Sequence, residues 1–208
     1  MEEMCPQEES GFTSGSRAGA LFEGIVARWH SLCPGLDWNC VCQDLLSGLR
    51  GIEREIECLG LINCFQWHLE DECRSSYHDA KAVLRLKQSI DASNHRRVEK
   101  IGEIDRGIAR RLRCLRPESP SGRLAPETPG NSYDRLSVLI LKRYHLSQKS
   151  LRREVLGPGC TAGMSDLLDE QIHDLVYMLD ETLMDLKTGK RRLKVYPAIK
   201  IYEKAPRS

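Results

Sequence analysis

The chain has 208 residues, of which 40% are hydrophobic and 29% charged, and its formal net charge is +1. This composition is typical of a soluble helical protein that buries the core of one domain, and the near-neutral charge gives no argument for nucleic-acid binding. No stretch reaches the roughly 18 uninterrupted apolar residues of a membrane-spanning helix, so we expect no membrane span.

The first 18 residues are polar and rich in Gly and Ser, which is typical of a disordered tail. The opening MEEMCPQEES is acidic, whereas a secretory signal peptide needs a basic region followed by an apolar one. We therefore expect the protein in the cytoplasm.

Apolar residues at helical spacing predict three helices in the N-terminal half. The first begins near Ala20 and ends at the CPG that follows it. Asp37 is placed to cap the second helix, which is expected to run to about Arg74. After a short break at SSYH, the third helix runs from about Asp79 to Cys114.

A loop rich in Pro and Gly, at about 115–130, separates the two halves. The fourth helix follows it, either with Thr128 as cap and Pro129 in the first helical position, or with Ser132 as cap after a turn. The fifth helix carries a leucine-rich stripe and ends at Gly189. The basic segment beyond it has few helical signals.

These elements predict an all-α fold, an antiparallel bundle of about five helices. We expect a disordered tail over residues 1–18, a single helical-bundle domain over 19–188 and an extended basic C-terminal arm over 189–208. The arm could touch phosphate, RNA or an acidic partner, but a solvated or docking arm is the simpler interpretation.

Polar side chains interrupt the predicted inward face of the third helix. At about 100° per residue, this face contains four of them beside the isoleucines: Lys87, Asn94, Arg97 and Asp105. A buried charge without a partner costs several kcal/mol, so such residues must pair, meet water or contact a ligand.

The second and fourth helices show the same pattern. The apolar stripe of the second helix continues as Asn63, Trp67, Glu70 and Arg74, near the hairpin that it shares with the third. The fourth helix is apolar over most of its circumference, so Asp134 is a further polar group expected at depth.

Two interpretations of these residues remain open. They form a satisfied network that fixes the helix register, for example through an ion pair of Glu70 with Arg97. Alternatively, they line a charged pocket for a small polar or phosphorylated ligand, which the number of unlike groups favours. Arg135 and Lys142 share a further line of the fourth helix and could present positive charge to an anion, or lie on the surface as solvated cations.

Metal-binding signals are weak in this sequence. Glu170 and His173 have the Glu-x-x-His spacing of di-iron bundles but are expected on a solvated acidic face. His68 with Glu70 and Asp71 is the better candidate, because Glu70 is expected to point inward. The nine cysteines, an odd number without a CxxC pair, indicate reduced thiols. We therefore assign no metal ligand.

Four segments of the chain carry a family resemblance: NCFQWHLEDECR, LKQSIDASNHRRVEKIGEID, TPGNSYDRLSVLILKRYH and LDEQIHDLVYMLDETLMDLKTGKRRLKVYPAIKIY. In this order they resemble the bacterial all-helical domain-of-unknown-function family forty-two fifty-four, over about residues 45–204. The chain departs from the family pattern at residues 95–98 and at Ala198, which leaves the roles of these positions open.

The resemblance implies a helical fold and a site at the motif residues, but no reaction. Members are often encoded near glycosyltransferases, which implies a role in bacterial surface polysaccharide biosynthesis. We therefore expect a pocket for an anionic small molecule such as a sugar phosphate or nucleotide sugar. The alternatives are a non-catalytic accessory that docks on a glycosyltransferase, and a metal-dependent hydrolase. The sequence identifies no cofactor and leaves open whether the protein is an enzyme.

The expected site residues fall into two groups. The carboxylates would serve as acid/base groups if the protein catalyses a reaction: Glu70, Asp71 and Asp134. The side chains expected to bind the ligand, with Arg74, Lys87 and Arg97 holding the anion, are Asn63, Trp67, His68, Arg74, Lys87, Asn94, Arg97, Arg135 and Lys142.

Overall fold

The computed structural model describes residues 12–32, 35–115, 122–151 and 158–197, and these ranges form an all-α bundle, as the sequence predicted. Two strands of two residues each accompany the helices: β1 (Arg123–Leu124) and β2 (Arg191–Arg192). The helices of the described residues are α1 (Gly15–Leu32), α2 (Trp38–Leu45), α3 (Gly51–Ser75), α4 (Ala80–Leu115), α5 (Pro129–Leu151) and α6 (Pro158–Thr188).

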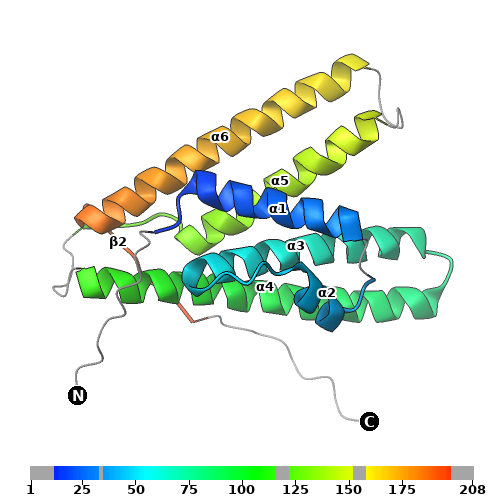
Figure 1. Ribbon diagram of the computed structural model, residues 1–208, viewed down its shortest axis with the longest axis horizontal. Helices are drawn as coiled ribbons and strands as arrows, with labels where there is room; N and C mark the ends of the chain where they lie inside the picture. Colours follow the sequence, from blue (N-terminus) through cyan, green and yellow to red (C-terminus); the bar gives the residue numbers. More distant parts are fainter. Residues whose placement is uncertain (1–11, 33–34, 116–121, 152–157, 198–208) are drawn as a thin grey trace, which may run out of the picture.

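The helices form two antiparallel pairs joined by α1 (Figure 1). The long helices α3 and α4 lie side by side, and α5 and α6 form a second hairpin that is inclined to the first. Helix α1 packs against α3, α5 and α6. The described helices include none long and apolar enough to cross a membrane.

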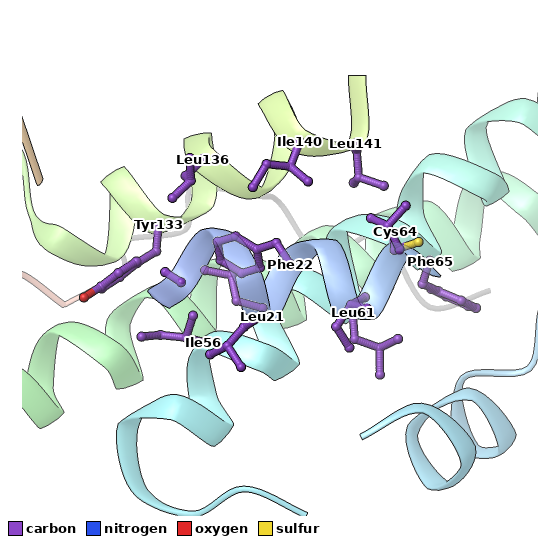
Figure 2. Packing of buried hydrophobic residues seen from close by; sticks show 14 of the residues in the cluster. Leu21, Phe22, Ile56, Leu61, Cys64, Phe65, Tyr133, Leu136, Ile140 and Leu141 are labelled. Atoms are coloured by element: carbon purple, nitrogen blue, oxygen red, sulfur yellow. The ribbon is translucent and has the colours of Figure 1, made fainter. Parts of the chain in front are cut away.

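The core lies where α1 meets α3 and α5. Figure 2 shows Phe22 of α1 at its centre, between Tyr133 and Leu136 of α5 and side chains of α3. A Cβ atom on Gly60 of α3 would lie 2.5 Å from Cδ1 of Phe22. Because glycine has no side chain, there is room for the Phe22 ring at this position. Phe22 is 1% exposed and Tyr133 is fully buried, so these aromatic rings fix the position of α1.

The predicted second helix is two helices in the structure. Asp37 caps α2 as predicted, because its Oδ1 accepts hydrogen bonds from the backbone N–H groups of Asn39 and Cys40 at 2.8 and 3.3 Å. The expectation of one helix to about residue 74 is wrong, since α2 ends at Leu45 and α3 begins at Gly51. Gly48 and Gly51 have φ of 78° and 61°, in the left-handed region that a continuous helix cannot contain.

Helix α1 begins at Gly15, inside the segment predicted as a disordered tail, because its first turn is held by the second hairpin. The N–H of Gly15 donates to Oδ1 of Asp180 at 2.7 Å, and the hydroxyl of Tyr133 donates to the carbonyl of Thr13. A Cβ on Gly15 would lie 2.9 Å from the carbonyl oxygen of Val176, so α1 and α6 approach closely here. Residues 1–11 lie outside the described residues.

The first part of the predicted C-terminal arm pairs with the loop before α5. Helix α6 ends at Thr188, and Gly189 follows with a φ of 77°, as the sequence indicated for a stop signal. β2 then pairs in parallel with β1, in the register Arg123 with Arg191. Residues 193–197 have no regular secondary structure, and the rest of the arm lies outside the described residues.

Candidate functional site

The polar residues on the inner face of α4 hold α5 in place. Asp105 is 4% exposed, and its Oδ1 accepts the backbone N–H of Gly130 at 2.7 Å. This N–H belongs to the first turn of α5 and has no partner within its own helix, so Asp105 caps α5 from a neighbouring helix. Burial raises the pKa of Asp105, and the hydrogen bonds of Thr128 and Gly130 partly offset this.

Thr128 caps the same helix from within the chain. Its Oγ1 accepts the N–H of Asn131 at 3.3 Å, and Pro129 is the first helical residue, which is the first of the two arrangements predicted for this terminus. A Cβ on Gly130 would lie 2.7 Å from the carbonyl oxygen of Ile101, so only glycine permits this close approach of α5 to α4.

A second polar contact, one turn into α5, links three helices. Arg97 of α4 donates through Nε and Nη2 to the two carboxylate oxygens of Asp134, at 2.7 and 2.5 Å. Asn63 of α3 donates through Nδ2 to Oδ1 of Asp134 at 2.9 Å and to Oγ of Ser137 at 2.5 Å. The hydrogen bond with Asp134 raises the pKa of Arg97. The sequence suggested Glu70 as the partner of Arg97, but the structure has Asp134 in that place.

Arg97 also lies at the boundary between two hollows. The larger, the α5–α6 cleft, has a volume of about 520 Å³ and lies between these two helices, closed by Arg97 and by Arg191 of β2. The smaller, the α3 hollow, has a volume of about 310 Å³ and lies against α3. Its lining residues are Asn63, Gln66, Trp67, Glu70, Arg74, Arg97, Val138 and Leu141.

The α5–α6 cleft is lined by both charges and apolar side chains. Its cations come from three elements: Arg97, Arg135, Lys142 and Arg191. Its acidic residues are Glu127, Asp134 and Asp174, and its apolar residues include Val138, Leu139, Leu175 and Met178. The lining of this cleft therefore contains four cations and three carboxylates, a formal excess of one positive charge.

The cations of the cleft differ in how they are paired. Arg135 contacts Glu127 at 3.0 Å, in a pair whose two side chains are 61% and 37% exposed. An ion pair in such solvent contact contributes little, so Arg135 can exchange it for a ligand. Lys142 is exposed and has no ion-pair partner among the described residues. These two side chains are therefore the most accessible cations of the cleft, whereas Arg97 and Arg191 are held in ion pairs with Asp134 and Asp185.

Eight of the residues predicted for the site line one or both hollows. These residues belong to three different helices, α3, α4 and α5. They are Asn63, Trp67, Glu70, Arg74, Arg97, Asp134, Arg135 and Lys142.

The inward placement of Lys87 and Asn94 is wrong, because both are exposed. The buried face of this part of α4 contains Ile90 and Ser93 and runs on to Arg97, so it is rotated by about one residue from the predicted sector. Lys87 instead forms a surface ion pair with Asp91 at 3.0 Å.

Two further predictions at the end of α3 need correction. Arg74 and Asp71 pair with each other at 2.5 Å, with side chains 66% and 49% exposed, so Arg74 does not lie on the inward face as expected and Asp71 is held at the surface. Arg74 still lines the α3 hollow, whereas Asp71 lines neither hollow. Both residues are exposed near the C-terminal end of α3.

His68 lies in a cluster that the sequence did not predict. It meets His30 of α1 and His145 of α5, and one ring nitrogen of each lies within 4.8 Å of the others. Each of the three follows an aromatic residue directly: Trp29, Trp67 and Tyr144. The same aromatic–histidine dipeptide occurs at Tyr77–His78, which is not part of the cluster, so only the fold shows which three copies come together.

Comparison with known proteins assigns the family. A family model described as "Protein of unknown function (DUF4254)" matches residues 53–195, which is more than half of the chain. The chain belongs to this family. The match to the DUF4254 model includes α3 to α6 and therefore all the residues of the two hollows. It confirms the resemblance seen in the sequence.

No curated protein and no solved structure matches the chain. The DUF4254 description names no ligand or reaction.

Proposed function

We propose that the protein binds an anionic small molecule, such as a sugar phosphate or a nucleotide sugar, in the α5–α6 cleft. The observation that carries this proposal is the position of Lys142, an unpaired cation among the described residues, on the wall of this cleft beside Arg135. A compact ammonium group and a guanidinium about two helical turns apart can hold one or two phosphate groups.

The size and lining of the cleft suit such a ligand. Its volume of about 520 Å³ falls in the range of small-molecule sites. Leu139 and Met178 offer apolar contact to a sugar or base, and Asp174 can accept hydrogen bonds from hydroxyl groups. The cleft thus combines polar groups that can fix the orientation of a ligand with apolar side chains that can contact it.

In this proposal Asp134 positions Arg97. Both carboxylate oxygens of Asp134 already accept hydrogen bonds from Arg97, and Asn63 adds another. The guanidinium is thereby fixed with Nε and Nη2 turned to Asp134, and Nη1 is left to face a ligand. The acid/base role expected for Asp134 is replaced here by orientation of a neighbouring cation.

The biological setting is part of the proposal and rests on what the family resemblance implies. We infer a cytoplasmic protein that handles a phosphorylated sugar in the biosynthesis of bacterial surface glycan. Support for this setting is the association of similar proteins with glycosyltransferases, and support for the chemistry is the charge in the cleft.

A thermal-shift measurement tests the proposal. The probes are inorganic phosphate, glucose 1-phosphate and a uridine diphosphate sugar, with wild type, Lys142→Ala and Arg135→Ala. At least one probe should raise the melting temperature of the wild type, and the Lys142→Ala variant should lose most of that shift. Lys81→Ala, at an exposed position of α4, is the matched control and should keep it. An equal shift in all variants, or none with any probe, contradicts binding in this cleft.

A docking function is the second candidate, and exposed apolar side chains of α6 favour it. Leu167, Tyr177 and Met184 are 53%, 60% and 55% exposed on this helix. Under this alternative the protein is an accessory of a glycosyltransferase and needs no small ligand. Replacing Leu167 and Tyr177 together by Lys should then abolish co-purification with a glycosyltransferase, whereas Lys142→Ala should not.

A further inference from the structure

The histidine cluster brings together three imidazole rings from three helices. His30 belongs to α1, His68 to α3 and His145 to α5. The ring centroids are 5.1 Å apart for His30 and His68, 5.2 Å for His30 and His145, and 5.4 Å for His68 and His145. The rings therefore form a nearly equilateral triangle.

The three rings are also inclined to one another by nearly equal angles, of 60°, 67° and 66°. This is the propeller arrangement that three ligands adopt around one centre. In a tetrahedral zinc site with Zn–N bonds of about 2.0–2.1 Å, each ring centroid lies about 3.2 Å from the metal and the centroids are about 5.2 Å apart. The observed spacings match this value.

An aromatic side chain covers each imidazole in a cyclic order. Trp29 precedes His30 but stacks on His68, at 4.9 Å between centroids and 2° between planes. Trp67 precedes His68 but stacks on His145, at 4.8 Å and 5°. Tyr144, which precedes His145, lies against the ring of His30, with 4.3 Å between the ring centroids and 40° between the ring planes. Each helix thus supplies one imidazole and the ring that supports the next.

The hydrogen bonds of the cluster leave ring nitrogens suited to a metal. Nδ1 of His30 lies 2.8 Å from the carbonyl oxygen of Val26, and because a carbonyl only accepts, this nitrogen carries the hydrogen. The lone pair of the neutral ring is then on Nε2, an arrangement typical of metal-binding histidines. Nε2 of His68 is buried and has no hydrogen-bond partner among the described residues.

The protonation state agrees with this geometry. Burial lowers the pKa of His68 to about 4, and the neighbouring His30 lowers it further, whereas Asp71 acts in the opposite direction. His68 is therefore neutral at physiological pH. A neutral imidazole is the form that binds a metal ion.

We propose that His30, His68 and His145 bind one divalent transition-metal ion, with Zn²⁺ as the best-fitting species. Three imidazole nitrogens suit zinc and its neighbours, whereas Mg²⁺ and Ca²⁺ require oxygen ligands. Three protein ligands leave a fourth position for water or for a group of a bound molecule. The inference goes beyond the anion cleft, because none of the three histidines lines it.

Binding requires a small rearrangement of the rings. The ligand nitrogens lie within 4.8 Å of one another, and tetrahedral zinc needs them about 3.3 Å apart. Rotation of the imidazoles about their side-chain torsions supplies this difference, since their centroids already have the required spacing.

Metal titration of the full chain tests the proposal. The protein is stripped with a chelator, its thiols are alkylated, and Zn²⁺ is titrated in competition with a chromophoric chelator. We expect one ion per chain in the wild type and a Kd raised by about 100-fold or more in His145→Ala. His173→Ala, at an exposed position of α6, is the matched control and should leave the Kd unchanged. Equal binding by wild type and His145→Ala overturns the proposal.

Cobalt distinguishes the histidines from the cysteines as ligands. Co²⁺ bound to the unalkylated protein should give the visible spectrum of a tetrahedral site without a thiolate charge-transfer band. A thiolate band would place the metal at cysteines and overturn the assignment. If His145→Ala fails to fold by circular dichroism, His30→Gln serves as the second variant, since His30 is only half-buried near the end of α1.

The metal proposal and the anion proposal can be tested independently of each other. Lys142→Ala should bind Zn²⁺ as the wild type does, and His145→Ala should keep the thermal shift caused by a phosphorylated probe. Loss of both functions in one folded variant would contradict the separation of the two sites.

Discussion

Removing Arg97 should destabilise the protein through the carboxylate that it leaves behind. In Arg97→Ala, Asp134 keeps its hydrogen bond from Asn63 but loses the cation, while its side chain remains only 8% exposed. Breaking a buried ion pair in this way costs about 3–5 kcal/mol. Because Arg97 itself is 30% exposed, water can enter its place, and we expect about 2–3 kcal/mol.

Urea unfolding and a double-mutant cycle check this value. A loss of about 2–3 kcal/mol corresponds to a fall in melting temperature of roughly 4–12 °C for a chain of this size. Adding Asp134→Ala to Arg97→Ala should restore part of the stability, because the unpaired charge is then gone. Lys87→Ala is the matched control on the exposed side of α4 and should change stability by less than about 0.5 kcal/mol. A loss this small in Arg97→Ala itself would refute the reasoning.

Two further predictions concern the start of α5. Because the folded-state pKa of Asp105 is raised, its contribution to the free energy of unfolding is greatest at low pH and declines as the pH rises through the folded pKa. Asp105→Asn keeps the acceptor for Gly130, so urea unfolding between pH 4 and 7 should show this variant gaining stability relative to wild type as the pH rises. Gly130→Ala should cost about 1–3 kcal/mol, since its Cβ would meet the backbone of α4.

The two predictions for the start of α5 can be contradicted independently. A stability difference between wild type and Asp105→Asn that does not change with pH would mean that burial does not govern this carboxyl group. Gly163→Ala is the matched control for Gly130→Ala, because a Cβ there has nothing within 4 Å. Equal melting temperatures for the two alanine variants would show that the approach of α5 to α4 is not tight.

Local signals in the sequence were sufficient for most helix boundaries. Asp37, Thr128 and Gly189 act through groups a few residues away, so their roles as caps and stop signal could be predicted. The break between α2 and α3 was missed because Leu45, Leu49 and Ile52 continue an apolar stripe across it. Gly48 and Gly51 adopt left-handed conformations between the two helices. In the sequence, the only indication of this break was the presence of two glycines within four residues.

The candidate site was predictable where a polar residue is truly buried. Asp134 and Arg97 fell on inward faces and do meet, because a buried charge must find a partner. Lys87 and Asn94 were misplaced because periodicity gives the direction of a face only to within about one residue. The histidine cluster could not be predicted, since its three rings come together only through the packing of α1, α3 and α5.

The pairing of β1 with β2 turns the second hairpin into a closed loop of backbone. The N–H of Arg123 donates to the carbonyl of Lys190 at 3.1 Å, and that of Ala125 to the carbonyl of Arg192 at 3.0 Å, so the chain that leaves at β1 returns to its starting point. Arg135, Lys142 and Arg191 all belong to this loop, whereas Arg97 stands on α4 outside it. A displacement of the loop relative to α4 would carry three cations of the cleft past the fourth, and both the ion pair of Arg97 with Asp134 and the hydrogen bond from Gly130 to Asp105 oppose it.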